Sequence, residues 1–447
     1  MDIVIKLSQF LLSLSLLIVL HELGHFIPAK LFKTRVEKFY LFFDVKYSLI
    51  KKKIGETEYG IGWLPLGGYV KISGMIDESM DKEQMALPPQ PWEFRSKPAW
   101  QRLIIMLGGV TVNFILAFII YIGMAYVYGD VYIANKDLKD GMLVENTILQ
   151  KIGFRTGDQI KAVDGETIEK FDKELTLKVL TAKEVVLHRN GADTTVKLPI
   201  DFVDQLDKVE KGILLDIRMP FVVGAISEGS KNTNLQPKDI VLAINGTPTK
   251  YFDQAKAVLE NNKNKTVTAT VLREEKEIKL PVVISADGKL GIGIGRLGME
   301  WLEKLGYYKV SKQQFSFAES IPVGITKGKD QLVGYGKQLK MIFSPSTGAY
   351  KQVGGFKAIF DIFPKTWSWE VFWNITALLS IMLGVMNLLP IPALDGGHVM
   401  FLLYEIVSGK KPSDKFLENA QMVGFVLLIT LLLFANGNDI YKAIIGK

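Results

Sequence analysis

The sequence contains no cysteine and only four histidines among its 447 residues. Without cysteine the chain forms no disulfide scaffold, no cysteine-ligated zinc finger and no iron–sulfur cluster, so any metal ligands must be histidines and carboxylates. Apolar residues make up 48% of the chain and charged residues 23%, which excludes a disordered protein. The net charge of +7 comes from lysines beside apolar runs and not from one basic stripe. This pattern indicates membrane topology, and no nucleic-acid partner is expected.

Four apolar runs are candidates for membrane spans. They cover Ile3 to Leu20, Leu103 to Tyr128, Val371 to Leu389 and, more briefly, Gln421 to Phe434. A cleaved signal peptide is the alternative for the first run, but that run has no basic leader and continues into a His-Glu motif instead of a small-residue cleavage site. The sequence therefore predicts a polytopic α-helical membrane protein with about four transmembrane helices.

Basic residues gather in the connections between the first two runs and between the last two. They are Lys30, Lys33, Arg35, Lys51, Lys52, Lys53, Arg95, Lys97, Arg102, Lys410, Lys411 and Lys415. Because loops rich in lysine and arginine remain in the cytosol, both connections are expected there. The termini and the segment from about 129 to 370 are then expected on the outer side.

The outer segment contains an internal repeat. Residues 158–165, Asp-Gln-Ile-Lys-Ala-Val-Asp-Gly, align with residues 239–246, Asp-Ile-Val-Leu-Ala-Ile-Asn-Gly, and the Phe-Asp pairs at 171 and 252 keep the same offset. Each copy predicts an apolar strand that enters a tight turn, and the repeat predicts two homologous modules.

The repeated strand and turn resemble those of PDZ domains. The resemblance implies two inserted PDZ-like β/α domains, at 129–215 and 216–300, followed by a linker with amphipathic segments at 301–370. Such domains bind an extended peptide at a sheet edge, so peptide or protein ligands are expected, and the alternative is a pair of spacers that bind nothing.

The first apolar run ends in a metal-binding pattern, His21-Glu22-Leu23-Gly24-His25. The spacing of four residues puts both imidazoles on one helical face, with Glu22 beside them. Two histidines and a glutamate are costly in lipid unless they face the protein interior and serve a function. Satisfied core histidines are the alternative.

A catalytic zinc needs a third protein ligand and an open position for water. Asp395 is the best candidate, because Pro390 and Pro392 should break the third run and the Gly-Gly pair that follows Asp395 permits a tight turn. Irregular chain would then present the aspartate at membrane depth. His398 is a rival ligand.

These motifs together resemble the site-2 protease family of intramembrane zinc metalloproteases. The resemblance covers most of the chain: His-Glu-x-Gly-His-Phe in the first run, Asn-x-x-Pro-x-Pro-x-Leu-Asp-Gly-Gly in the third, and tandem PDZ-like modules between the second and the third. It implies that His21, His25 and Asp395 bind Zn2+ and that Glu22 is the general base. It further implies substrate contacts from Asn387 and Asn113.

The same resemblance implies a location and a substrate class. The protein is expected as a multi-pass protein of the bacterial inner membrane, acting on single-span membrane proteins, with the active site near the cytosolic side. Two alternatives are a membrane-anchored PDZ adaptor with a non-catalytic metal site and a metal transporter. Glu22 argues against both. A carboxylate is costly in lipid, and neither an adaptor nor a transporter gains from one that is not a metal ligand.

The segment at about 56–72 alternates as strand, glycine-rich turn and strand, which predicts a β-hairpin. It lies in the cytosolic loop of a first domain, residues 1–128, that also contains the first two transmembrane helices. The resemblance implies that this hairpin is membrane-associated and that its edge, formed by Tyr69, Val70, Lys71 and Ile72, holds the unwound substrate. A plain cytosolic hairpin is the alternative. Residues 371–447 are expected to carry the last two helices.

Overall fold

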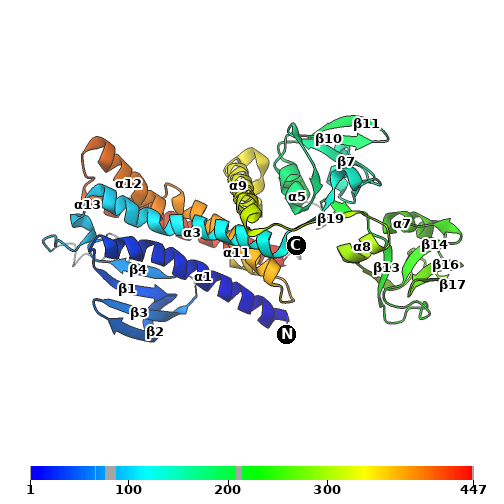
Figure 1. The fold of residues 1–447 in the computed structure, drawn as a ribbon, viewed down its shortest axis with the longest axis horizontal. Coiled ribbons are helices and arrows are strands. Elements are labelled where there is room, and N and C mark those ends of the chain that lie inside the picture. Colours follow the sequence, from blue (N-terminus) through cyan, green and yellow to red (C-terminus); the bar gives the residue numbers. More distant parts are fainter. Residues whose placement is uncertain (1, 66, 76–86, 208–213, 445–447) are drawn as a thin grey trace. The chain divides into compact units, whose positions relative to one another are not determined.

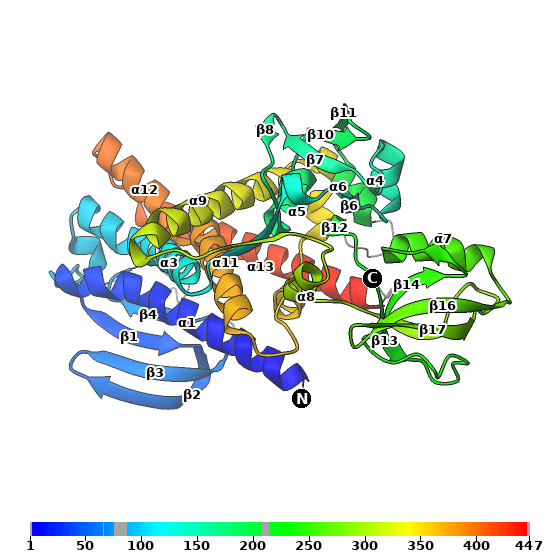
Figure 2. The same ribbon diagram turned by 45° about the vertical axis from the view of Figure 1, so that its right-hand side comes forward.

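The computed structural model describes residues 2–65, 67–75, 87–207 and 214–444. These form two compact units (Figures 1 and 2). The helical unit comprises Met1–Gly129, Gln314–Phe343 and Tyr350–Lys447, and the β-rich unit comprises Asp130–Gln313 and Ser344–Ala349.

Four helices of the helical unit are long and apolar enough to cross a membrane, which confirms the prediction of a polytopic membrane protein for the described part of the chain. They are α1 (Asp2–Leu31), α3 (Ala99–Tyr128), α11 (Trp369–Leu388) and α13 (Asp414–Ile444). Helix α1 continues past the end of its apolar run at Leu20, so the whole His-Glu motif is helical.

Helix α3 packs against α1 at a crossing of small residues. A Cβ atom added at Gly24 of α1 would lie 2.4 Å from the carbonyl oxygen of Gly108, and one at Gly108 would lie even nearer the carbonyl of Gly24. Only glycine permits this approach of the two backbones. Helix α11 is joined to its neighbours by hydroxyl groups, because Ser13 and Thr376 are hydrogen-bonded at 3.0 Å and Ser380 donates to the Asn113 carbonyl at 2.7 Å.

A short helix, α12 (Asp395–Ser408), follows the third span after a linker that contains Pro390 and Pro392. The expected break after α11 is present, but the expectation that irregular chain presents Asp395 is wrong, because this aspartate is the first residue of α12. Helix α12 packs on α3, where Arg102 and Glu405 form an ion pair at 2.5 Å with both side chains largely buried.

The loop between α1 and α3 forms a four-stranded sheet of order β2-β3-β1-β4. Its strands are β1 (Val36–Leu41), β2 (Phe43–Ile54), β3 (Thr57–Leu64) and β4 (Tyr69–Ile72). The predicted hairpin of β3 with β4 is wrong: β1 lies between them, parallel to β3 and antiparallel to β4, and β3 forms its hairpin with β2.

The reason for this pairing is burial that the local turn signal does not reveal. Tyr40 of β1 is fully buried, and its ring covers Gly60 of β3, where a Cβ atom would lie 2.4 Å from the ring. The consequence is that β4 is an edge strand, with β1 on one side and no other strand of the described chain on the other.

The remaining elements of the helical unit include the amphipathic helix α9 (Phe317–Ile342), which packs on α3. Gly324 and Gly328 of α9 face Ile122 and Phe118 of α3 at distances that leave no space for a Cβ atom. The shorter elements are η1 (Phe94–Ser96), η4 (Ala349–Gln352), which begins at the last residue of the β-rich unit, and α10 (Phe356–Asp361).

The first module of the β-rich unit contains a sheet of order β11-β10-β7-β8. These strands are β7 (Gln159–Val163), β8 (Glu166–Thr167), β10 (Glu184–Arg189) and β11 (Ala192–Lys197). Two smaller sheets complete it: β6 (Met142–Leu143) with β12 (Asp216–Ile217), and β5 (Asp130–Ala134) between β9 (Lys170–Phe171) and β19 (Val310–Gln313). Its helices are η2 (Asn135–Asp137), α4 (Thr147–Ile152), α5 (Lys173–Leu180) and α6 (Phe202–Asp207), with η3 (Pro345–Thr347) packed on α6.

The second module contains a six-stranded sheet of order β17-β16-β14-β13-β18, with β15 paired to β14. Its strands are β13 (Phe221–Ile226), β14 (Ile240–Ile244), β15 (Thr247–Pro248), β16 (Thr266–Arg273), β17 (Lys276–Val283) and β18 (Ile292–Gly295). Helix α7 (Phe252–Asn261) packs on this sheet, and α8 (Met299–Lys304) follows the module.

The sequence repeat corresponds to equivalent structure in the two modules. Buried Asp158 pairs with Arg189 at 2.6 Å in the first, and buried Asp239 pairs with Arg273 at 2.6 Å in the second. The turns after β7 and β14 both use a residue of positive φ, followed by glycine. The PDZ-like identity of the modules stays a prediction.

Candidate metal centre

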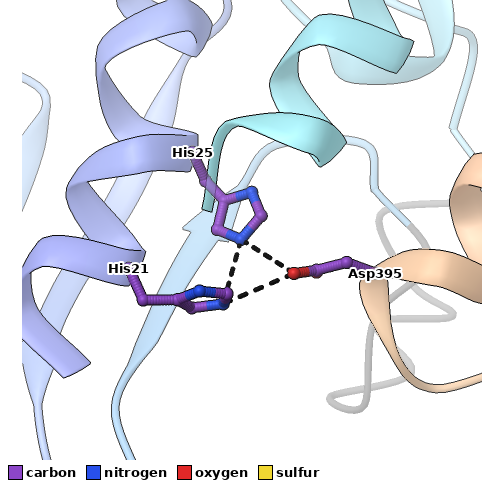
Figure 3. Close-up of side chains that lie close together, drawn as sticks. All are labelled: His21, His25 and Asp395. Carbon is purple, nitrogen blue, oxygen red and sulfur yellow. Dashed lines mark hydrogen bonds and ion pairs between the residues drawn. The ribbon is translucent and has the colours of Figure 1, made fainter. Parts of the chain in front are cut away.

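Three side chains that are far apart in the sequence converge inside the helical unit. The Nε2 atoms of His21 and His25 lie 3.3 Å apart, and they lie 3.4 and 3.3 Å from Oδ2 of Asp395 (Figure 3). Both histidines are buried, and they reach Asp395 from α1 while the aspartate begins α12. His21, His25 and Asp395 form the one candidate metal cluster among the described residues.

The triangle of donor atoms fits a zinc ion. Donors bound tetrahedrally at about 2.0 to 2.1 Å from zinc lie about 3.3 to 3.4 Å from one another, which is the spacing found here. Apart from the two imidazoles, Oδ2 of Asp395 is buried without a hydrogen-bond partner in the described chain, and a bound cation removes that cost. Two imidazoles and one carboxylate are a donor set typical of zinc.

Gly109 of α3 makes room for both imidazoles. A Cβ atom at this position would lie 2.4 Å from Nε2 of His25 and 2.6 Å from Cε1 of His21. Any other residue therefore displaces the rings. Reasoning from the sequence missed this role, although a pair of glycines in an apolar run is a visible signal of close packing.

The protonation of His25 is determined by its neighbour on the opposite side of the ring. Nδ1 of His25 lies 2.8 Å from the backbone carbonyl oxygen of Ile105, which can only accept a hydrogen bond. Nδ1 therefore carries a proton, and the lone pair of Nε2 is the one available to a metal ion.

Glu22 lies between the three ligands and the edge strand β4. Its carboxylate accepts a hydrogen bond from the backbone N–H of Val70 and interacts electrostatically with both histidines and Asp395. A Cβ atom added at Gly68, just before β4, would lie 3.7 Å from Cγ of Glu22. A carboxylate beside the ligand cluster but outside the triangle has the position that a general base needs.

Two asparagines contact His21 from different elements. Nδ2 of Asn387, near the end of α11, lies 3.3 Å from Nε2, on the metal side of the ring. Nδ2 of Asn113, on α3, lies 3.0 Å from Nδ1, on the opposite side. The structure thus separates the two asparagines that the sequence grouped as substrate contacts.

His398 does not join the cluster. It lies in α12, about one helical turn after Asp395, and its Nε2 is 2.7 Å from Nε2 of Gln421 on α13. The rival ligand of the sequence analysis is therefore placed between α12 and α13 and not with His21 and His25.

The four residues of β4 differ in what they expose. Tyr69 donates to Asp44 at 2.8 Å, and burial together with this hydrogen bond raises the pKa of its phenol. Lys71 pairs with Glu37 at 3.4 Å, and the Ile72 side chain is buried. The side chains of Tyr69, Lys71 and Ile72 are consequently engaged within the protein, and the backbone of β4 is what the strand offers to a binding partner.

The fold and the site together define a polytopic membrane metalloprotease with a His-His-Asp centre and a neighbouring glutamate. The chain belongs to peptidase family M50, whose family model matches residues 9–431. It is 28% identical to the regulator of sigma-E protease RseP of Escherichia coli K12, over 97% of this chain and 98% of that protein. A Neisseria meningitidis protein whose name assigns it to the zinc metalloproteases is 25% identical, over 98% of this chain and 99% of its own. The family and these names identify the chain as a zinc metalloendopeptidase.

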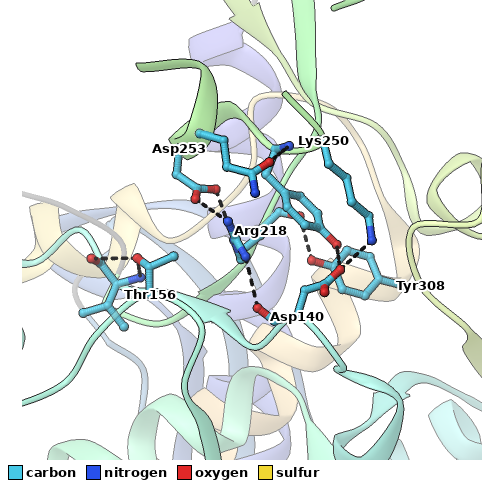
Figure 4. Close-up of polar contacts among 9 residues, drawn as sticks. Asp140, Thr156, Arg218, Lys250, Asp253 and Tyr308 are labelled. Carbon is cyan, nitrogen blue, oxygen red and sulfur yellow. Dashed lines mark hydrogen bonds and ion pairs between the residues drawn. The ribbon is translucent and has the colours of Figure 1, made fainter. Parts of the chain in front are cut away.

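A second polar cluster lies in the β-rich unit and joins its two modules (Figure 4). Asp140 of the first module accepts hydrogen bonds from Lys250 at 2.5 Å and from the buried Tyr251 at 2.6 Å, both of the second module. These bonds hold the pKa of Asp140 below its usual range. Arg218 binds Asp253 at 2.6 Å and also donates to the Asp140 carbonyl. Every charge here has a partner, so the cluster is a structural joint.

Proposed function

We propose that this zinc metalloprotease hydrolyses peptide bonds within the transmembrane segments of single-span membrane proteins. The observation that carries the proposal is where the ligands lie: His21 and His25 are in α1, one of the four membrane-length helices, and Asp395 follows α11, another of them. A site built on such helices is reached by substrates that are themselves in the bilayer.

The chain's own residues supply the acid–base and positioning chemistry. Zinc, when bound, lowers the pKa of a water ligand and polarises the scissile carbonyl. Glu22 takes the proton of the attacking water and passes it to the leaving amine. Asn387, on the metal side of His21, is placed to donate to the substrate carbonyl as charge develops on its oxygen.

The edge of β4 receives the substrate backbone. The carbonyl and N–H groups of a substrate helix are occupied by the helix's own hydrogen bonds, so the helix must unwind before attack. The open edge formed by Tyr69, Val70, Lys71 and Ile72 offers replacement hydrogen bonds next to Glu22, whatever the substrate's side chains.

The proposed location is the bacterial inner membrane, with the site near the cytosolic side. Two features support it: the basic residues gather in the connections that precede α3 and α13, and α13 exposes Val423, Val426 and Leu433, as lipid contact requires. The β-rich unit then lies outside, where its PDZ-like modules bind peptides or proteins and restrict which substrates enter.

One experiment tests the proposal directly. Purified protein in detergent is assayed for zinc content and for cleavage of a single-span membrane protein, with the cut mapped by mass spectrometry. We expect one zinc per chain and a cut within the membrane segment. Zinc without cleavage would favour the adaptor with a non-catalytic metal site, and a cut only outside the membrane segment would contradict the proposal.

A further inference from the structure

Asn113 lies behind His21, away from the position where a substrate would bind. It is fully buried in α3, and its side-chain amide contacts Nδ1 of His21, on the side of the ring opposite the metal. Its backbone carbonyl accepts the hydrogen bond of Ser380. Its side-chain oxygen Oδ1, however, is buried and has no hydrogen-bond partner among the described residues.

This unpaired oxygen is explained by turning the amide. Rotation by 180° exchanges the oxygen and nitrogen of an asparagine with almost no change of shape. The oxygen then faces Nδ1 of His21 and accepts its proton, so the buried acceptor becomes paired. With the proton on Nδ1, Nε2 carries the lone pair that a metal ligand requires.

The neighbours of the two imidazoles support the same protonation. Nδ1 of His25 faces the Ile105 carbonyl, which accepts only, so its Nε2 is the free nitrogen. Nε2 of His21 faces the side-chain amide of Asn387, which can donate to a lone pair on that nitrogen. An acceptor behind His21 makes the two rings equivalent, each with the lone pair of Nε2 available to a metal ion bound beside Asp395.

We propose that Asn113 is a positioning residue: it accepts the Nδ1 proton of His21 and so holds that imidazole in the tautomer and orientation that bind zinc. The proposal rests on the proposed function of the site as a zinc centre. It replaces the substrate contact expected for Asn113 with an action through His21. Hydrogen-bond partners behind metal-bound histidines commonly change metal affinity by about 10- to 100-fold.

The competing explanation is that Asn113 only joins helices. Ser380 of α11 donates to its backbone carbonyl, and the residue is packed in the centre of the bundle. A change in thermal stability alone therefore does not distinguish the two roles of Asn113. Three substitutions separate the two roles: N113D keeps an acceptor, N113L keeps a similar volume without one, and Ser380→Ala removes the helix contact while leaving the amide of Asn113 in place.

The test measures zinc affinity of the full-length protein in detergent by competition with a chelator, using an affinity tag without histidine. We expect N113L to bind zinc about 10- to 100-fold more weakly, while N113D and S380A stay within about threefold of the parent protein. Nitrogen-15 NMR of labelled histidine in the metal-free protein is expected to show protonated Nδ1 at His21 in the parent, and a mixture of tautomers in N113L. Thermal melting of each variant confirms the fold.

Two results would overturn the inference. One is unchanged zinc affinity in a folded N113L, and the other is a protonated Nε2 at His21 in the parent protein. Failure of the proposed function has a different signature, since a parent protein that binds zinc tightly but cuts no membrane segment leaves the affinity comparison intact. If N113L does not fold, N113A takes its place, and it is expected to bind zinc more weakly than N113D.

Discussion

The backbone N–H of Val70 donates a hydrogen bond to the carboxylate of Glu22. The edge strand β4 therefore meets α1 at the residue proposed as the general base. Val70 is one of the residues expected to pair with the substrate, so the proposed substrate-binding strand and the proposed general base are in direct contact. A substrate strand that pairs with β4 is therefore expected to lie beside Glu22.

Replacing Glu22 with glutamine separates proton transfer from metal binding. Glutamine has nearly the same shape but no basic carboxylate, so we expect cleavage to fall by about 100-fold or more. Zinc content, measured by atomic absorption, is expected to remain at the parent value because Glu22 lies outside the triangle of ligands. Cleavage at the parent rate in E22Q would remove Glu22 from the mechanism.

The third ligand is tested by comparing Asp395→Ala with His398→Ala. D395A removes the one carboxylate of the triangle and is expected to leave zinc substoichiometric. H398A removes the contact with Gln421, which lies outside the triangle of ligands, and is expected to keep one zinc per chain. The opposite metal contents would show that the third ligand has been assigned wrongly.

Gly109 is tested against a glycine of the same helix. The added methyl group of Gly109→Ala collides with both imidazoles, so zinc affinity is expected to fall by at least about tenfold. Gly123→Ala is the matched control, because a Cβ atom there has no neighbour within 4 Å and alanine favours a helix. Equal zinc affinity in the two variants would mean that the rings move away without cost.

The edge of β4 is tested with proline. Val70→Pro removes the N–H that faces Glu22, and loss of one hydrogen bond of about 1 to 1.5 kcal/mol corresponds to roughly tenfold slower cleavage. Val70→Ala keeps the backbone and is expected to have a mild effect.

Lys71→Pro acts differently, since successive N–H groups of a strand point to opposite edges and that of Lys71 faces β1. We expect this variant to melt at a lower temperature. Parent-level cleavage in V70P with an unchanged melting temperature would show that the N–H of Val70 contributes neither to holding Glu22 nor to binding the substrate.

The joint between the two modules depends on the charge of Asp140. Asp140→Ala removes the partner of Lys250 and of the buried Tyr251, so we expect faster hydrogen exchange around residues 247–254 at pH 7. Because the pKa of Asp140 is lowered, its contribution is complete at neutral pH and is lost as the pH falls through that lowered value. Asp193→Ala, which removes the exposed pair with Lys161, is the control and should leave exchange there unchanged.

The sequence by itself determined the features that depend on local pattern and composition. Four apolar runs are visible as spans because lipid demands about twenty apolar residues whatever the tertiary fold. The spacing of His21 and His25 places them on one helical face for the same local reason. Asp395 was singled out because only carboxylates and histidines remain as ligands in a chain without cysteine, and because prolines interrupt the helix before it.

Only the tertiary structure decided which distant groups meet. The insertion of β1 between β3 and β4 follows from the burial of Tyr40 over Gly60, and no local turn signal carries that information. Likewise, the sequence placed Asn113 near the site but did not show which side of the His21 ring it contacts. The face that α3 turns toward α1 is set by packing at the small residues of both helices. Helical and strand periods are properties of neighbouring residues, whereas register, crossing and contact arise from burial between segments far apart in the chain.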